Sequence, residues 1–401
     1  MMLKKQPIMN LGTLGAVSGG KSTLIKSLTG VNTQRHANEL LRNISMRAGY
    51  ANLKIISNAD GSLKSTDDNY NLLEDEKIIH RLSFVDCPGH RQLTRVMLGQ
   101  VNLMAGAIAI ISMAEEVSSN YQLNEHLKAA KIAGLDKIIV CLNKCDLVSK
   151  DVIKQKYTET LELFNKIGLE PPLCVIPTSF NRSLNINYLI EAIITYFPAE
   201  NYVEESIEKP FFPISRSFDI NKAGSDILSL KGGIVGGTLI NGTLSVGDKV
   251  IIRPGNIINR NGKLVATPIR TVIKGIMSEK SSLDKIQTGG LMALATDINS
   301  HFTKNDRMVG NVICLEDDDR FVTTDQLILD ISFINKKINL NLKDSISIQI
   351  GPSSITAIIT KFRKKKYTVN LSRPSCIQKG TKLYLSTNDE KMTIIGSSIF
   401  S

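Results

Sequence analysis

The sequence predicts an α/β domain, built on a mostly parallel sheet with helices on both faces, followed by two β-barrel domains. Between residues 8 and 196, short apolar runs alternate with helix-length amphipathic segments, which indicates a parallel sheet. From Phe211 onward the runs are short and punctuated by glycine, as in barrels or sandwiches. Composition breaks at the charged stretch 204–210 and the acidic run 316–319. The expected domains are residues 1–203, 204–320 and 321–401.

The elements of the first domain are expected in a regular order. Apolar runs predict strands at 8–14, 82–85, 107–112, 137–142 and 173–177. Amphipathic segments predict helices at 22–28, 93–102, 152–167 and 186–197. In the last domain, strands are expected at 326–333, 345–350 and 353–362.

The composition excludes several classes of protein. Of 401 residues, 42% are hydrophobic and 22% charged, so neither a coiled coil nor a disordered chain is expected. The longest apolar run, 101–114, is shorter than the ~20 residues that span a bilayer, so we expect no membrane span. Six cysteines form no CxxC pair, which argues against a zinc site or disulfides. With no targeting segment identified, a cytoplasmic protein is expected.

The charge balance leaves two explanations open. Lys and Arg number 49 against 38 Asp and Glu, which gives a net charge of +11 and a pI near 9.2. Such an excess favours contact with a polyanion such as RNA. The alternative is a lysine-rich drift in composition, since the chain is also rich in Ile and Asn and has no Trp.

A phosphate-binding loop follows the first predicted strand. The segment Gly15-Ala16-Val17-Ser18-Gly19-Gly20-Lys21-Ser22 matches GxxxxGK[ST] between a strand and a helix. We expect its backbone N–H groups, from Val17 to Ser22, to surround the α- and β-phosphates of a nucleotide. Lys21 would reach the β- and γ-oxygens, and the Ser22 hydroxyl would bind Mg²⁺. The predicted nucleotide-binding residues here are Gly15, Val17, Ser18, Gly19, Gly20, Lys21, Ser22 and Thr23.

A second motif, Asp86-Cys87-Pro88-Gly89-His90, follows the strand predicted at 82–85. Asp86 is placed to hold Mg²⁺, and Gly89 can present its N–H to a γ-phosphate because it has no side chain. His90 could orient the attacking water. The predicted catalytic residues are therefore His90, Asp86 and Lys21, although DCPGH by itself would also suit a simple turn.

A third motif, Asn143-Lys144-Cys145-Asp146, ends another predicted strand and selects the base. Guanine offers two adjacent donors, and the carboxylate of Asp146 can accept both, whereas adenine cannot match that pattern. Asn143 would brace the loop and the base, and the stem of Lys144 would lie along the ring. Ser179, in Pro177-Thr178-Ser179-Phe180, would support Asp146 or offer a backbone N–H to guanine.

The order of these motifs strengthens each of them. Every one comes just after a predicted strand, so all should lie along the carboxyl edge of the sheet, where such folds bind ligands. We therefore predict a guanine-nucleotide site. His36, His80, His126 and His301 have no partner motif and are expected to be surface or satisfied polar residues.

Further segments carry a resemblance to a known family over nearly the whole chain. They are NLGTLG at 10–15, NEL at 38–40 with RNIS at 42–45, GYANLKI at 49–55, RSFD at 216–219, LKGGIVGG at 230–237 and DRMVG at 306–310. On these residues the chain resembles the translational GTPases, and most closely the gamma subunit of eukaryotic and archaeal translation initiation factor 2.

The resemblance implies a GTPase domain and two β-barrels that together carry methionyl initiator tRNA to the small ribosomal subunit. It implies a heterotrimer with alpha and beta subunits, slow GTP hydrolysis that releases the tRNA, and partners for nucleotide exchange and GTPase activation. By the same resemblance, Ser45 would bind Mg²⁺ beside Ser22 and Asp86, and Phe180 would lie beside guanine. Tyr50 and Arg216 would help to hold the aminoacylated end of the tRNA.

The chain departs from the family at a few positions. Ser45 stands where the family has threonine, which keeps a hydroxyl for Mg²⁺ but loosens its rotamer. Ala16 and Gly19 replace histidines, and Phe180 replaces alanine, so its ring is expected to crowd the guanine edge. The cysteine knuckle of many members is absent from 57–77, so no zinc is predicted.

Three alternatives remain for the function. One is an elongation-type GTPase that delivers another aminoacyl-tRNA. The others are an assembly module that does not hydrolyse GTP and a basic RNA-binding protein with a vestigial nucleotide site. The run from Arg363 to Lys366 would suit a solvated hairpin edge or an RNA contact, which should weaken steeply with salt.

Overall fold

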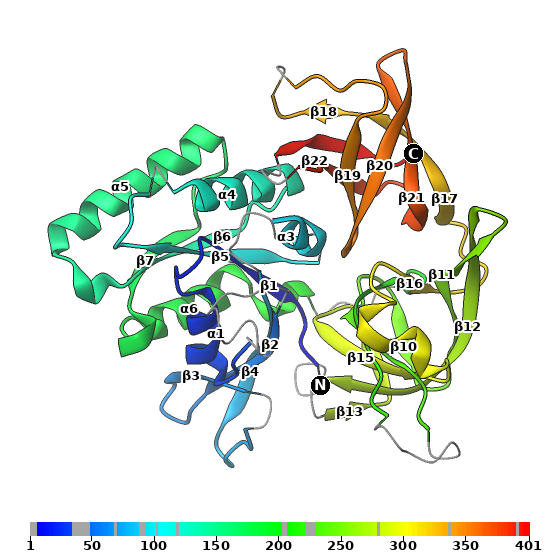
Figure 1. The fold of residues 1–401 in the computed structure, drawn as a ribbon. Helices are drawn as coiled ribbons and strands as arrows, with labels where there is room; N and C mark the ends of the chain where they lie inside the picture. The colour runs from blue at the N-terminus through cyan, green and yellow to red at the C-terminus, as the bar shows by residue number, and fades with distance from the viewer. Residues whose placement is uncertain are drawn as a thin grey trace. The chain divides into compact units, whose positions relative to one another are not determined.

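The chain folds into two compact units. The computed structural model describes residues 6–33, 49–67, 70–87, 94–101, 103–117, 120–202, 207–221, 230–278, 281–335, 338–389 and 393–401. The first unit comprises Met1–Glu204 and the second Glu205–Ser401 (Figure 1). In the described residues no helix is both long and apolar enough to cross a membrane.

The first unit contains a seven-stranded sheet in the order β3-β2-β4-β1-β5-β6-β7. The five strands from β4 to β7 in this order are parallel, while β2 pairs antiparallel with both β3 and β4. The strands are β1 (Asn10–Leu14), β2 (Gly49–Ser57), β3 (Leu63–Thr66), β4 (Lys77–Asp86), β5 (Gly106–Ser112), β6 (Ile138–Asn143) and β7 (Cys174–Thr178). This confirms the predicted mostly parallel sheet.

Helices cover both faces of this sheet. Figure 1 shows α1 (Lys21–Thr29) and α6 (Ile186–Tyr196) on one face, and α3 (Thr94–Val101), α4 (Tyr121–Ala133) and α5 (Lys150–Ile167) on the other. Apolar residues of α1 and α6, such as Leu24 and Leu189, pack with the central strands in one buried core. Short 3₁₀ turns follow β6 at Cys145–Leu147 and β7 at Phe180–Arg182, and a third lies at Ala199–Tyr202.

The second unit begins with a closed antiparallel barrel. Its strand order is β11-β16-β8-β9-β15-β12-β13, and β11 also pairs with β12, which closes the sheet. The larger strands are β8 (Phe212–Phe218), β9 (Ile234–Thr238), β11 (Lys249–Arg260), β12 (Lys263–Ser278) and β15 (Leu291–Thr296). The smaller elements are β10 (Thr243–Ser245), β13 (Ser281–Leu283), β14 (Lys285–Gln287), β16 (Val312–Cys314) and 3₁₀ turns at Ser300–Phe302 and Lys304–Asp306.

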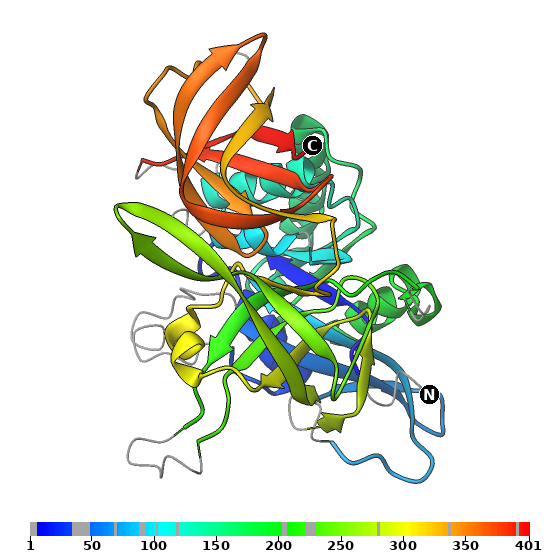
Figure 2. The same ribbon diagram turned by 90° about the vertical axis from the view of Figure 1, so that its right-hand side faces the viewer.

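A second antiparallel sheet with its own apolar core completes this unit. Its order is β17-β21-β20-β19-β22-β23-β18, and its core includes Ile348, Val369 and Leu385. The strands are β17 (Phe321–Asp330), β18 (Ser332–Phe333), β19 (Ser345–Ile350), β20 (Ser353–Arg363), β21 (Lys366–Gln378), β22 (Lys382–Thr387) and β23 (Ile394–Ile399). Figure 2 shows this sheet, in orange and red, curled into a barrel. The boundaries 1–203, 204–320 and 321–401 stay predictions.

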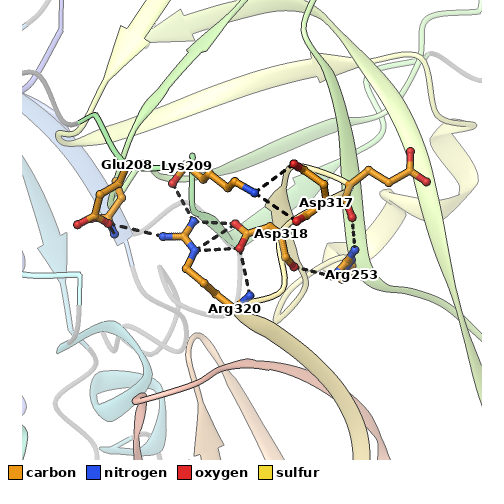
Figure 3. Close-up of polar contacts among 8 residues, drawn as sticks. Glu208, Lys209, Arg253, Asp317, Asp318 and Arg320 are labelled. Atoms are coloured by element: carbon orange, nitrogen blue, oxygen red, sulfur yellow. Dashed lines mark hydrogen bonds and ion pairs between the residues drawn. The ribbon is translucent and has the colours of Figure 1, made fainter.

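The two barrels are joined by an apolar cluster and a network of charges. Residues of both sheets, Ile251, Cys314, Phe321 and Cys376 among them, form one buried cluster. Beside it Arg320 binds the carboxylate of Asp318, with Nη2 2.7 Å from Oδ2, and donates to the carbonyl oxygen of Lys209 at 2.9 Å (Figure 3).

The same network includes residues of both charged stretches, 204–210 and 316–319, at which the composition of the sequence changes. Lys209, from the first charged stretch, donates to Asp317 Oδ2 of the acidic run at 3.1 Å, and Arg253 of β11 donates to the carbonyl oxygens of Glu316 and Asp318 (Figure 3). The charged residues of the two stretches therefore bind one another and β11 of the first barrel.

Candidate nucleotide-binding site

The loop after β1 has the backbone geometry that a phosphate cradle requires. Gly15 and Gly20 have φ angles of +136° and +109°, a region that side chains rarely adopt. A Cβ on Gly15 would lie 2.3 Å from the carbonyl oxygen of Ile110, and one on Gly20 would lie 2.3 Å from the side-chain nitrogen of Asn143. Helix α1 then begins at Lys21. The loop therefore leaves backbone N–H groups at the positive end of a helix dipole.

Lys21 is held under this loop. Its Nζ donates to the carbonyl oxygens of Gly15, at 3.0 Å, and Ala16, at 2.6 Å. Burial lowers the pKa of the ammonium, and the charge of nearby Asp86 opposes that effect. The role of Lys21 as a phosphate ligand stays a prediction.

Asp86 is the centre of a cluster of hydroxyl groups at the end of β4. Its Oδ2 accepts hydrogen bonds from Ser22 Oγ at 2.7 Å and from Thr33 Oγ1 at 2.5 Å. Its Oδ1 accepts from Thr13 Oγ1 at 3.0 Å. The structure thus brings together the two predicted Mg²⁺ residues, Ser22 and Asp86.

Helix α4 supports the loop from behind. His126 Nδ1 accepts the backbone N–H of Gly15 at 3.1 Å, and Gln122 Oε1 accepts that of Val17 at 3.0 Å. Burial lowers the pKa of His126 to about 3, so the imidazole is neutral at physiological pH. The N–H of Val17, which the sequence predicts to face a phosphate, is thus bonded to Gln122 instead. The side chain of Gln122 on α4 is long enough to accept this N–H group.

Asn143 connects the loop to the base-selecting segment. Its side chain donates to the carbonyl oxygen of Gly19 at 2.9 Å and accepts the backbone N–H of Phe180 at 3.2 Å. The ring of Phe180 lies in the hydrophobic core with residues of α1, and is 3% exposed. The ring also lies beside the phosphate loop, with Cδ2 3.4 Å from the position that a Cβ on Gly20 would take, and its place at the guanine edge stays a prediction.

Asp146 lies at the surface of the same edge. A hydrogen bond from the side chain of buried Ser179 lowers the pKa of its carboxyl group, and the charge of Arg182 lowers it further. The Nε of Arg182 is 3.0 Å from Asp146 Oδ2. Lys144, just before, takes a left-handed conformation with φ of 66° that turns the chain from β6 into the 3₁₀ segment. An ionised Asp146 can accept both donors of guanine.

The donor set fits the expected ligands. Carboxylate and hydroxyl oxygens are the ligands that Mg²⁺ prefers, and Asp86 and Ser22 supply one of each within 2.7 Å. Gly15 and Gly20 let the loop pass close to Ile110 and Asn143, where a Cβ would clash. These residues would hold Mg²⁺, and a bound Mg²⁺ would neutralise charge on the phosphates. The expectation of no zinc stays an expectation.

Some predicted site residues cannot be placed. Ser45, Gly89 and His90 lie outside the described residues, so their roles stay predictions. Tyr50 is half-buried on β2, opposite Val85 of β4.

Arg216 lies on β8 in the second unit. Its Nε donates to Asp306 Oδ1 at 3.1 Å, and its guanidinium carbon is 5.1 Å from the centre of the Phe218 ring. The RSFD and DRMVG segments of the sequence thus meet in one ion pair.

Four residues of the site escaped the sequence reasoning: Thr13, Thr33, Gln122 and His126. Thr13 stands in the segment that directly precedes the phosphate loop, so its position in the sequence could have identified it as a residue of the site. Thr33 and His126 bond to residues 53 and 111 positions away, and no local pattern announces such contacts.

Comparisons with known proteins agree with this geometry. Residues 6–199 match the family described as elongation factor Tu GTP binding domain, and residues 325–399 match initiation factor eIF2 gamma, C terminal. The chain is 34% identical to translation initiation factor 2 subunit gamma of Methanocaldococcus jannaschii, over 95% of this chain and 94% of that one. It is 30% identical to the eukaryotic translation initiation factor 2 subunit gamma of Encephalitozoon cuniculi, over 96% and 90%.

Solved structures share the fold. A bacterial selenocysteine-specific elongation factor, EF-Sec, has a TM-score of 0.74 at 21% identity; the match covers 98% of this chain and 58% of that one. Elongation factor SelB from Methanococcus maripaludis, in complex with the GTP analogue GPPNHP, has a TM-score of 0.72 at 18% identity, over 99% and 79%.

Proposed function

The chain belongs to the translation initiation factor 2 gamma-subunit family of translational GTPases, and on that basis we propose that it carries methionyl initiator tRNA to the small ribosomal subunit. In this proposal the GTP-bound form holds the charged tRNA, and hydrolysis of GTP to GDP and phosphate releases it. The protein acts as the gamma subunit of a heterotrimer with alpha and beta subunits.

The observation that carries the nucleotide part is the meeting of Ser22 and Asp86 at 2.7 Å beside the phosphate loop. Lys21 would bind the β- and γ-oxygens, and Asp146, with Ser179 behind it, would bind guanine. Ser45 would add a hydroxyl on the same side, Gly89 an N–H to the γ-phosphate, and His90 would orient the attacking water.

The tRNA part rests on the family and on the barrel after the GTPase domain. Arg216 is half-buried, paired with Asp306 and stacked near Phe218, so its guanidinium is fixed in place. A guanidinium held in this way can bind a phosphate or a terminal carbonyl of the tRNA. Tyr50 would contribute from the GTPase domain.

Intrinsic hydrolysis should be slow, on the order of 10⁻⁴ to 10⁻³ per second, as in GTPases without an arginine supplied by a partner. The proposal therefore includes a GTPase-activating partner and a nucleotide-exchange partner. It also places the protein in the cytoplasm, where ribosomes and charged tRNA are found.

The test is filter binding of charged initiator tRNA and charged elongator tRNA to the purified protein, with a GTP analogue or with GDP. The proposal expects tight binding only of initiator tRNA and only with the GTP analogue. Lys21→Met serves as the control, because it weakens nucleotide binding and should therefore reduce tRNA binding to the level seen with GDP.

Each other outcome identifies one alternative. Equally tight binding of both tRNAs would indicate an elongation-type factor, and tight binding that is the same with GDP as with the GTP analogue would indicate a basic RNA-binding protein. Initiator-specific binding with no nucleotide turnover on ribosomes would indicate an assembly module that does not hydrolyse GTP.

A further inference from the structure

The hairpin between β20 and β21 carries a concentrated positive charge at its tip. Five of the six residues from 361 to 366 are Lys or Arg, and all six are exposed. Among the described residues, none of these five cations has an ion-pair partner. Asp330 of β17 lies opposite Lys366 in the register but forms no ion pair with it. The hairpin extends to the top of Figure 1.

The turn itself is built from residues that fit it badly. Lys364 and Lys365 both take the left-handed conformation, with φ of 51° and 64°. Two-residue turns of this kind favour Asn-Gly, because most side chains are strained at positive φ. In addition, Arg363 lies directly opposite Lys366, and like charges opposite each other on paired strands destabilise a hairpin.

The first barrel contains the same two-residue turn, with the same pair of opposed like charges but without the backbone strain. There Arg260 lies opposite Lys263, and the two turn residues between them are Asn261 and Gly262, with φ of 53° and 82°. The two tips thus read Arg-Asn-Gly-Lys and Arg-Lys-Lys-Lys on the same turn geometry. The second barrel keeps lysine where Asn-Gly would relieve the backbone, and strain of this kind is typical of functional positions.

An aromatic ring stands beside these cations. Phe362 is 56% exposed, and one side of its ring packs on Tyr367, with centroids 4.5 Å apart. In the register the two residues face each other directly behind the charged tip. An exposed ring held by a neighbour beside lysine and arginine is the arrangement on which proteins stack unpaired bases while binding the adjoining phosphates.

We infer that the tip of the β20–β21 hairpin, residues 361–367, is an RNA-binding element that binds phosphates through its lysines and stacks an unpaired base on Phe362. The charge selects a polyanion, and the ring favours RNA with an accessible base over other anionic partners. This element is separate from the proposed tRNA contacts at Tyr50 and Arg216. Its binding requires no nucleotide, so it stands whether or not the proposed function holds.

The experiment measures binding of a fluorescein-labelled RNA stem-loop, with no aminoacylated end, to the full chain over a range of salt concentrations. The key variant is Lys364→Asn with Lys365→Gly, which copies the tip of the first barrel. It should weaken binding by roughly tenfold near 0.1 M salt and lower the slope of log affinity against log salt by about one to two. The same variant should raise Tm by roughly 2–4 °C, because the strain is removed.

The matched control keeps the net charge of the protein. Adding Asn261→Lys and Gly262→Lys to the key variant moves the two lysines to the other hairpin, and binding should stay weak. Lys364→Gln with Lys365→Gln keeps long side chains in the turn and should weaken binding equally. Phe362→Leu should weaken binding of the looped RNA severalfold and leave binding of a fully paired duplex unchanged.

Three results would overturn the inference. RNA affinity and salt slope could stay unchanged in the key variant, or the charge-moved control could restore full binding. The hairpin could also bind phosphatidylserine vesicles, lost in the key variant, while RNA binding is unaffected. In each case the lysines would have another role.

Discussion

Arg182 and Asp146 form an ion pair at the edge of the sheet, with Nε of Arg182 3.0 Å from Oδ2 of Asp146. The oxygen that Arg182 binds belongs to the carboxylate that is predicted to accept the two donors of guanine. The side chain of Arg182 is 67% exposed and that of Asp146 is 13% exposed. The base must therefore share or displace this contact when it binds.

Replacing Arg182 with alanine should raise the affinity for GDP by roughly two- to fivefold, since an exposed ion pair of this kind competes only weakly. Fluorescent GDP titrations of Arg182→Ala and the wild type measure the change. Arg182→Lys, which keeps the charge but loses the Nε contact, is the matched control. A lower affinity in Arg182→Ala would instead show that the guanidinium stacks on the bound base.

Asp146→Asn should reverse the preference for the base. The amide can no longer accept two donors, so GTP affinity should fall roughly 10- to 100-fold, while xanthosine triphosphate should be bound in its place. Competition between the two triphosphates measures the preference. Unchanged GTP affinity would contradict the assignment of Asp146, and Asp151→Asn, on the exposed surface of α5, should change nothing.

Lys21→Met should lower triphosphate affinity by about 100-fold or more without lowering Tm. The methionine fills the same buried space, and the chain no longer has to bury the ammonium that donates to the carbonyl oxygens of Gly15 and Ala16. Lys26→Met, which removes an exposed lysine from the same helix, is the control and should bind normally. Normal affinity in Lys21→Met would exclude the phosphate loop.

His126 should make the protein less stable as the pH falls. In the folded state the pKa of His126 is about 3, below the ordinary value of 6.5. Between these two pH values the unfolded state therefore binds a proton at His126 that the folded state does not bind. The contribution of His126 to the free energy of unfolding is fully present above pH 6.5 and is lost as the pH falls from there toward 3. The loss amounts to about 2 kcal/mol between pH 7.5 and pH 5.

The measurement compares urea unfolding of the wild type and His126→Asn at several pH values. Asparagine keeps an acceptor for the N–H of Gly15 but cannot be protonated, so the difference between the two proteins should shrink or reverse at pH 5. A constant difference across this range would show that His126 is accessible to protons in the folded state.

The sequence predicted the parallel strands well because each is a continuous apolar run beside a helix. It did not predict β2, since Asn52 and Lys54 interrupt its apolar pattern although both are buried. Asn52 accepts a hydrogen bond from Ser83 at 2.7 Å, and Lys54 donates to the carbonyl oxygen of Tyr70. A buried polar residue is acceptable only with such partners, and the pattern of β2 alone does not reveal them.

Helix α4 was also missed, although its ends are marked in the chain. Asn120 caps it by accepting the N–H of Leu123, and Gly134 ends it in the left-handed conformation. Of the site, the residues inside short motifs were predictable because one loop presents them together. His126 and Gln122 were not, because they act through the packing of α4 behind that loop.

The charge network around Arg320 also bears on how the two barrels unfold. The side chain of Asp318 is fully buried beneath Arg320, and the apolar cluster next to it draws on both sheets. Pulling one barrel from the other would expose the apolar cluster that residues of both sheets build, a costly intermediate. Heat should therefore melt residues 207–401 in a single calorimetric transition, so that two barrels with separate cores unfold as one cooperative unit.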